Sequence, residues 1–100
     1  MVRTVIYTML VISSLLLSAQ SSAADDPPIR LATTTSTDNS GLLAYILPAF
    51  ERESSYKVHI IAVGTGKALR MGRDGDVDVL LVHAPKAEAD FVAAGYGLRR

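Results

Sequence analysis

The chain has 100 residues, in which ten Lys and Arg side chains balance ten Asp and Glu side chains, and it contains no cysteine. This balance leaves no excess of positive charge for binding nucleic acid or an anionic membrane surface. The lack of cysteine excludes both a disulfide framework and a lipid-modified cysteine.

The first 24 residues have the composition of a signal peptide. A positive charge near the start precedes an apolar stretch, Val5 to Leu17, which is short for a membrane span and is followed by small residues. Cleavage after Ala23 or Ala24 suits signal peptidase, whereas a short N-terminal membrane anchor is the alternative. We expect residues 1–24 to be removed and residues 25–100 to reach the periplasm.

The remaining segment alternates predicted strands with predicted helices. The expected strands are 29–33, 58–63 and 77–82, and the expected helices contain 42–50, 67–73 and 86–94. Strand–helix alternation implies right-handed crossovers and therefore an α/β fold with a parallel sheet. The third strand is almost continuously apolar, which predicts a sheet covered on both faces.

Five consecutive hydroxyl side chains, Thr33 to Thr37, follow the first predicted strand and precede a helix. The free N–H groups and the positive dipole end of a helix lie at its start. Hydroxyls and N–H groups together suit a small oxyanion. Ser and Thr are also ordinary helix caps, but a cap needs one such residue and this turn has five.

Two further turns follow the second and third predicted strands. The second turn is Gly64-Thr65-Gly66, and the third contains His83. The glycine turn matches neither a Walker loop nor a dinucleotide fingerprint in its spacing. Thr65 still offers a hydroxyl and an N–H at the start of a helix, although a plain glycine turn is the alternative. Because parallel strands end at one edge of the sheet, we expect all three turns to meet there.

The uncharged character of the hydroxyl run bears on the choice of anion. Phosphate keeps a proton near neutral pH and benefits from an acidic acceptor, whereas sulfate, molybdate and tungstate need only donors. No acidic residue lies within 33–37, and Asp38 follows at a position where a helix start favours an acid in any case. The sequence therefore favours a proton-free oxyanion over phosphate and predicts neither a cofactor nor a metal-cation site.

Three segments together resemble the tungstate-binding proteins of bacterial tungstate ABC transporters: Ala32 to Leu43, Ala62 to Leu69 and Gly75 to Pro85. The resemblance implies a type II periplasmic solute-binding protein, in which two α/β lobes close on the anion. Residues 25–100 would be the N-terminal part of the first lobe, and the second lobe is absent from this chain.

The resemblance also implies a ligand set and a role. The implied oxyanion ligands are Thr34, Thr35, Ser36 and Thr65. The implied protein is a monomer without enzymatic activity that delivers tungstate or molybdate to an inner-membrane permease. Charge and shape do not separate these two ions, because they share both. An exported phosphate-handling α/β enzyme and a ligand-sensing module of a larger protein are the alternatives.

Overall fold

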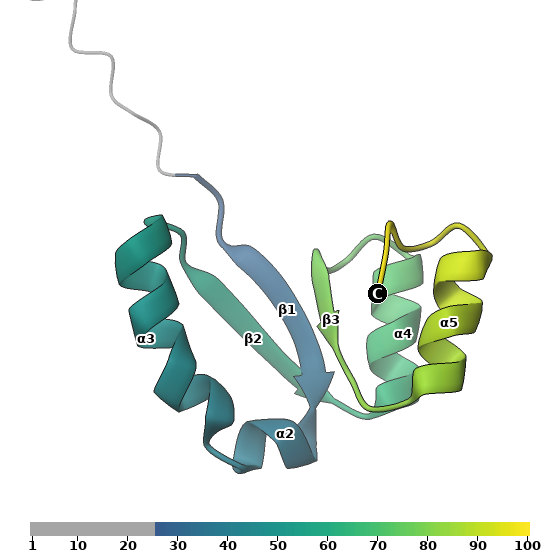
Figure 1. The fold of residues 1–100 in the computed structure, drawn as a ribbon, viewed down its shortest axis with the longest axis horizontal. Coiled ribbons are helices and arrows are strands. Elements are labelled where there is room, and N and C mark those ends of the chain that lie inside the picture. The colour runs from purple at the N-terminus through teal and green to yellow at the C-terminus, as the bar shows by residue number, and fades with distance from the viewer. Residues whose placement is uncertain (1–25) are drawn as a thin grey trace, which may run out of the picture.

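The computed structural model describes residues 26–100 (Figure 1), and the predicted signal peptide at 1–24 lies outside the described residues. The elements in chain order are β1 (Ile29–Thr34), α2 (Thr35–Asn39), α3 (Leu42–Ser54), β2 (Val58–Val63), α4 (Thr65–Arg73), β3 (Val79–Leu81) and α5 (Pro85–Ala93). None of the helices in this part of the chain is long and apolar enough to cross a membrane.

The three strands form one sheet in the order β2-β1-β3, and both pairings are parallel. The longer pairing, between β1 and β2, runs from Ile29 opposite Val58 to Thr34 opposite Val63. The shorter pairing joins β1 to the three residues of β3. The predicted α/β class with a parallel sheet is therefore confirmed.

One face of the sheet packs against α4. Ala32 of β1, Ala68 of α4 and Val77, just before β3, are buried and form the centre of the core. The partly buried side chains packed against this centre are Ile61, Val63, Met71, Leu80 and Val82. Figure 1 shows α4 and α5 on the β3 side of the molecule and α3 on the β2 side.

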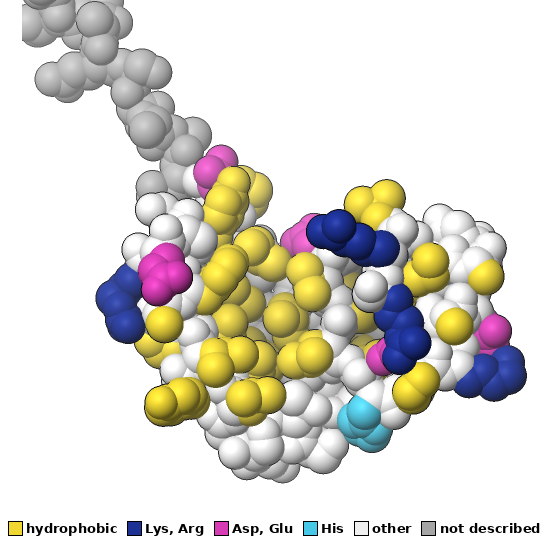
Figure 2. Space-filling model, in the orientation of Figure 1, with side chains coloured by type: hydrophobic (Ala, Val, Ile, Leu, Met, Phe, Trp, Pro, Cys, Tyr) yellow, Lys and Arg dark blue, Asp and Glu magenta, His cyan; other side chains and the backbone are white. Residues whose placement is uncertain are grey.

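The other face of the sheet is more open. Leu43 of α3 is 2% exposed, but several large apolar side chains on α3 and β3 face solvent. They are Leu42, Ile46, Phe50, Val79 and Leu81. Figure 2 shows apolar side chains gathered between α3 and the strands. The expectation of a sheet covered on both faces is therefore wrong for the described residues, because no element within them covers Val79 and Leu81.

The structure also corrects three element boundaries. The hydroxyl run is not a turn before a long helix, because its last three members begin the short helix α2. A left-handed residue, Gly41 (φ 81°), then separates α2 from α3. The helix α4 begins at Thr65, two residues before its predicted start, and β3 covers only half of the predicted strand at 77–82. Val77 contributes to the core instead of to the sheet.

Candidate functional site

The three turns singled out in the sequence do meet at one edge of the sheet. Thr34, the last residue of β1, lies opposite Val63, the last residue of β2. On the other side of β1, Thr33 lies opposite Leu81, the last residue of β3. Parallel pairing in this register brings the starts of α2 and α4 to the carboxyl edge, where open α/β sheets bind ligands.

Thr33 links two strands at this edge. Its side chain is fully buried, and Oγ1 donates a hydrogen bond of 2.8 Å to the backbone carbonyl of Leu81. This bond links the end of β1 to the end of β3. Thr33 therefore serves the architecture of the edge, and its hydroxyl is not presented to solvent.

Thr34 is the N-cap of α2. Its Oγ1 accepts a hydrogen bond from the backbone N–H of Thr37 at 3.3 Å, in extended backbone geometry (φ −86°, ψ 151°). The same oxygen lies 2.8 Å from Thr37 Oγ1 and 3.2 Å from Ser36 Oγ. Thr34 is only 5% exposed. The capping role that is the alternative for Ser and Thr thus applies to this one hydroxyl, and Thr35 and Ser36 are the members of the run that remain exposed.

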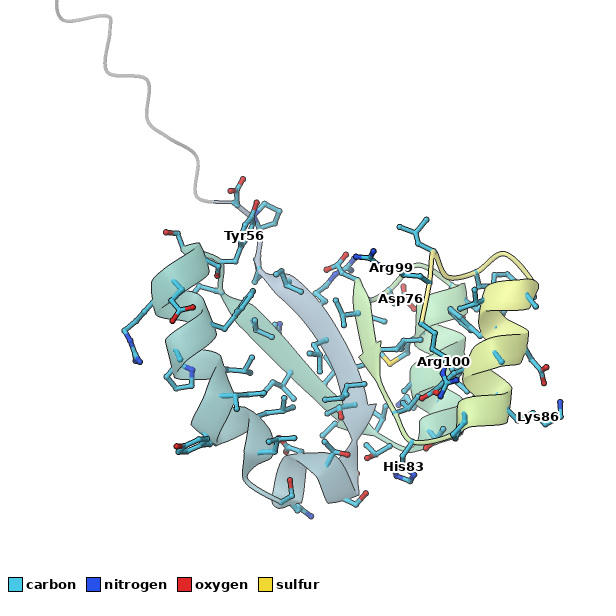
Figure 3. All side chains as sticks on the ribbon, in the orientation of Figure 1. Tyr56, Asp76, His83, Lys86, Arg99 and Arg100 are labelled. Atoms are coloured by element: carbon cyan, nitrogen blue, oxygen red, sulfur yellow. The ribbon has the colours of Figure 1, made fainter. Side chains whose placement is uncertain are left out.

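Thr35 and Ser36 form the first two positions of α2 and are exposed. At these positions the backbone N–H groups have no acceptor one turn back in the helix. Each residue therefore offers an N–H and a hydroxyl at the carboxyl edge. In Figure 2 the visible face of α2 is white, and the cyan side chain beside it is His83, labelled in Figure 3 just after β3.

Thr65 opens α4 and is half-buried. The preceding N-cap, Gly64, makes no side-chain hydrogen bond to the helix, so the N–H groups of Thr65 and Gly66 receive no cap. Gly64 has φ −72°, which any residue adopts, and a Cβ there would meet no atom within 4 Å. Neither the backbone nor the packing therefore requires glycine at this position, and the space beside the N–H groups is open.

The four predicted ligand residues are thus brought to one edge, but in different states. Thr35 and Ser36 are accessible, Thr65 is half-buried, and Thr34 is buried in its capping network. Their role as ligands stays a prediction. The fixing role of Thr33 cannot be predicted from the sequence, because a buried threonine on a strand gives no local signal of its bond to a residue 48 positions away.

Two other kinds of binding site, a metal site and a hollow in the surface, are less well supported in the described residues. Within residues 26–100, no group of three or more His, Asp or Glu side chains is placed to hold a metal ion. A hollow of about 650 Å³ lies between β3, α5 and the C-terminal segment, and its lining includes Leu80, Phe91, Tyr96 and Leu98. The charged residues that also line the hollow include two carboxylates, Asp78 and Glu88, and Arg100 already pairs with Glu88. The carboxyl edge, with its uncharged donors, is therefore the better candidate for a dianion.

A parallel α/β unit with uncharged hydrogen-bond donors at the carboxyl edge of its sheet defines a ligand-binding protein of the open α/β class. The sequence profile of the PBP superfamily domain matches residues 19–100. The chain belongs to the PBP superfamily.

Characterised relatives share much of this sequence. The chain is 60% identical to the tungstate-binding protein TupA of Peptoclostridium acidaminophilum over 72 residues, which are 72% of this chain and 25% of that protein. It is 52% identical to the tungstate-binding protein TupA of Campylobacter jejuni over 65 residues, covering 65% of this chain and 24% of that protein. The chain thus spans about a quarter of the length of these relatives.

Solved structures show the same fold. The tungstate-binding protein TupA from Desulfovibrio alaskensis aligns with a TM-score of 0.72 at 55% identity, covering 74% of this chain and 30% of that chain. The structure of the tungstate ABC transporter from Geobacter sulfurreducens aligns with a TM-score of 0.72 at 51% identity. The alignment covers 76% of this chain and 33% of that chain. The described residues therefore match part of a larger fold.

Proposed function

We propose that this protein binds tungstate or molybdate in the periplasm and delivers the anion to the permease of an ABC transporter. One observation carries the proposal: the pairing of Thr34 with Val63 places the start of α2 and the start of α4, which has no side-chain cap, at the same edge of the sheet. The relatives named as tungstate-binding proteins support this choice of ligand.

The chemistry of this edge suits a proton-free dianion. The hydroxyls of Thr35, Ser36 and Thr65 and the backbone N–H groups at the same positions can all donate to anion oxygens. Asp38, the acid in the first turn of α2, is exposed. Because no acid is among these donors, they favour tungstate, molybdate and sulfate over hydrogen phosphate, whose proton needs an acceptor.

The protein's wider roles follow from the same proposal. Residues 1–24 act as a cleaved signal peptide, and residues 25–100 form the N-terminal part of one lobe of a two-lobed, monomeric binding protein. The protein carries out no bond-making step. Lobe closure around the anion removes water and strengthens each hydrogen bond in the lower local dielectric.

Calorimetric titration of the protein expressed from its complete reading frame tests the proposal. Tungstate, molybdate, sulfate and phosphate are titrated separately at neutral pH. We expect tungstate and molybdate to bind most tightly and phosphate weakly. A preference for phosphate, or no binding of any of the four anions, would contradict the proposal.

A further inference from the structure

The exposed side of α4 carries two basic residues close to the candidate site. Lys67 is the third residue of this helix and Arg70 lies one turn further on, and both are exposed. Within residues 26–100, five ion pairs join other basic residues to carboxylates, and neither Lys67 nor Arg70 takes part in one. Both positive charges are therefore free of a neutralising partner in the described part of the chain.

Arg70 folds back along α4 toward the start of the helix. Its Nη1 lies 3.6 Å from the position that a Cβ on Gly66 would occupy. Helical side chains lean toward the N-terminus, so a residue four positions on covers the preceding turn. With hydrogen in place of a side chain at Gly66, the guanidinium lies over the turn whose N–H groups are uncapped.

Lys67, in the first turn of α4, departs from the usual distribution of charge along a helix. Acidic side chains favour the first turn of a helix and basic ones disfavour it, because the dipole is positive there. The helices α2 and α5 follow the rule with Asp38 and Glu88, whereas α3 and α4 have no acid in the first turn, and α4 has Lys67 there. Arg70 belongs to the last turn, but its guanidinium reaches back over Gly66, so that both positive charges lie where a bound anion would be stabilised.

We propose that Arg70, supported by Lys67, is a specificity-determining residue that favours dianions over monoanions at the carboxyl edge; this inference rests on the proposed function. A fixed positive charge attracts a dianion with twice the energy with which it attracts a monoanion of the same size. The hydroxyls and N–H groups recognise the tetrahedral shape of the anion, and Arg70 responds to the charge of the anion.

Two tetrahedral anions of nearly equal size separate these contributions: tungstate, a dianion, and perrhenate, a monoanion. Both are titrated into the protein from its complete reading frame and into its Arg70→Gln variant at low ionic strength. We expect the variant to lose about five- to tenfold in tungstate affinity and only about two- to threefold in perrhenate affinity. At about 1 M salt, where the screening length is about 3 Å, the tungstate loss should largely disappear.

Arg73→Gln is the matched control, because it removes the same charge from the same helix. Arg73 pairs with Asp74 at 3.5 Å and lies about 12 Å along α4 from Thr65, beyond the screening length of about 10 Å at 0.1 M salt. We expect this variant to bind both anions like the unmodified protein. Arg70→Lys, which keeps the charge, should retain most of the tungstate affinity, and thermal unfolding should show all variants folded.

The outcomes separate this inference from the proposed function. If the unmodified protein binds tungstate and Arg70→Gln weakens both anions equally, or matches Arg73→Gln, the role of Arg70 is wrong and the proposed function stands. If the unmodified protein binds none of the oxyanions, both proposals are wrong.

Discussion

Asp78 and Arg30 hold the sheet together at the edge opposite the candidate site. The backbone N–H of Arg30 donates to Asp78 Oδ2 at 2.8 Å, and the backbone N–H of Asp78 donates to the Arg30 carbonyl at 2.9 Å. The Arg30 Nε lies 3.5 Å from the same carboxylate oxygen. The segment before β3 is therefore fixed to β1 by one bond between backbone groups and one from a backbone N–H to a side-chain carboxylate.

This pairing predicts an acid-sensitive contribution to stability. The N–H bond from Arg30, followed by its guanidinium, holds the pKa of Asp78 below its ordinary value. A depressed pKa in the folded state means that the stabilisation is fully present above the unfolded pKa of about 4 and is lost as pH falls through the folded pKa.

Asp78→Asn keeps the size and one acceptor but removes the charge. We expect the variant to have a lower Tm than the unmodified protein at pH 6 and a shallower loss of Tm between about pH 4 and pH 2. Circular dichroism melts across this range measure both effects. Glu51, whose pKa is also lowered, first by the N–H bond from Val58 and then by Lys57, leaves some acid dependence in the variant. Parallel Tm curves for the two proteins would show that Asp78 is not the titrating group.

Thr33→Val tests the bond that joins β1 to the end of β3. Valine fits the buried position but cannot donate to the Leu81 carbonyl. We expect the free energy of unfolding to fall by about 0.5–1.5 kcal/mol, which urea denaturation measures. Thr35→Val is the control for hydroxyl loss at an exposed site, and we expect its unfolding free energy to change by less than about 0.5 kcal/mol. Equal losses in the two variants would mean that the Thr33 bond contributes nothing specific.

Gly64→Ser tests why α4 begins without a side-chain cap. Serine fits the open space and the extended backbone at this position, and its hydroxyl can accept from the N–H groups that glycine leaves free. We expect stability to stay equal or rise by a few tenths of a kcal/mol, while tungstate binding weakens because the hydroxyl competes with the anion. Calorimetry and urea denaturation on the same preparation separate the two effects, and unchanged binding would show that these N–H groups do not contact the anion.

Gly72→Ala tests a glycine of α4 that, unlike Gly64, has no room for a side chain. A Cβ at Gly72 would lie 2.8 Å from Leu80 Cδ1 and 3.1 Å from Phe91 Cζ. Overpacking of this kind costs about 1–3 kcal/mol and exceeds the gain of about 1 kcal/mol from better helix propensity. We expect lower stability in urea denaturation with tungstate affinity intact; a stabilised Gly72→Ala variant would show that this contact relaxes freely.

Thr65→Val tests the ligand that the sequence assigns to the second turn. Valine keeps the shape of the side chain and removes one donor. Because a hydrogen bond to a charged group contributes about 1.5–3 kcal/mol, we expect a loss of about ten- to a hundredfold in tungstate affinity with the fold intact. Calorimetric titration of the full-length variant measures this loss. Affinity equal to that of the unmodified protein would leave Thr65 as a turn residue only.

The sequence was sufficient to predict the parallel sheet and the meeting of three turns, because both follow from the alternation of strands and helices along the chain. It was not sufficient to place the Thr33–Thr37 run correctly. Thr34 caps a five-residue helix formed by the end of this run, and the left-handed Gly41 then starts a new helix. A polar stretch without an apolar face carries no helical periodicity, so the only signal for α2 was the threonine three positions before Thr37.

The bounds of the third strand could not be predicted from the sequence either, for a different reason. All six residues of 77–82 except Asp78 are apolar, but only Val79 to Leu81 pair with β1. Val77 is buried in the core, and the side chain of Asp78 accepts the N–H of Arg30 in place of a ladder carbonyl. Apolar composition does not show which of these residues pair with β1, because the unpaired Val77 and the paired Leu80 both pack in the core.

The central position of β1 bears on how an anion could leave. Within the described residues, β2 and β3 pair only with β1, and Thr33 and Thr34 are the last residues of β1 at the candidate site. Fraying of this strand end would break the link to Leu81 and undo the cap of α2 together. Amide hydrogens along β1 should therefore exchange with solvent only through cooperative opening of the whole sheet. Under the proposed function, release of the anion would then come from movement of the elements around β1, while β1 itself stays fixed.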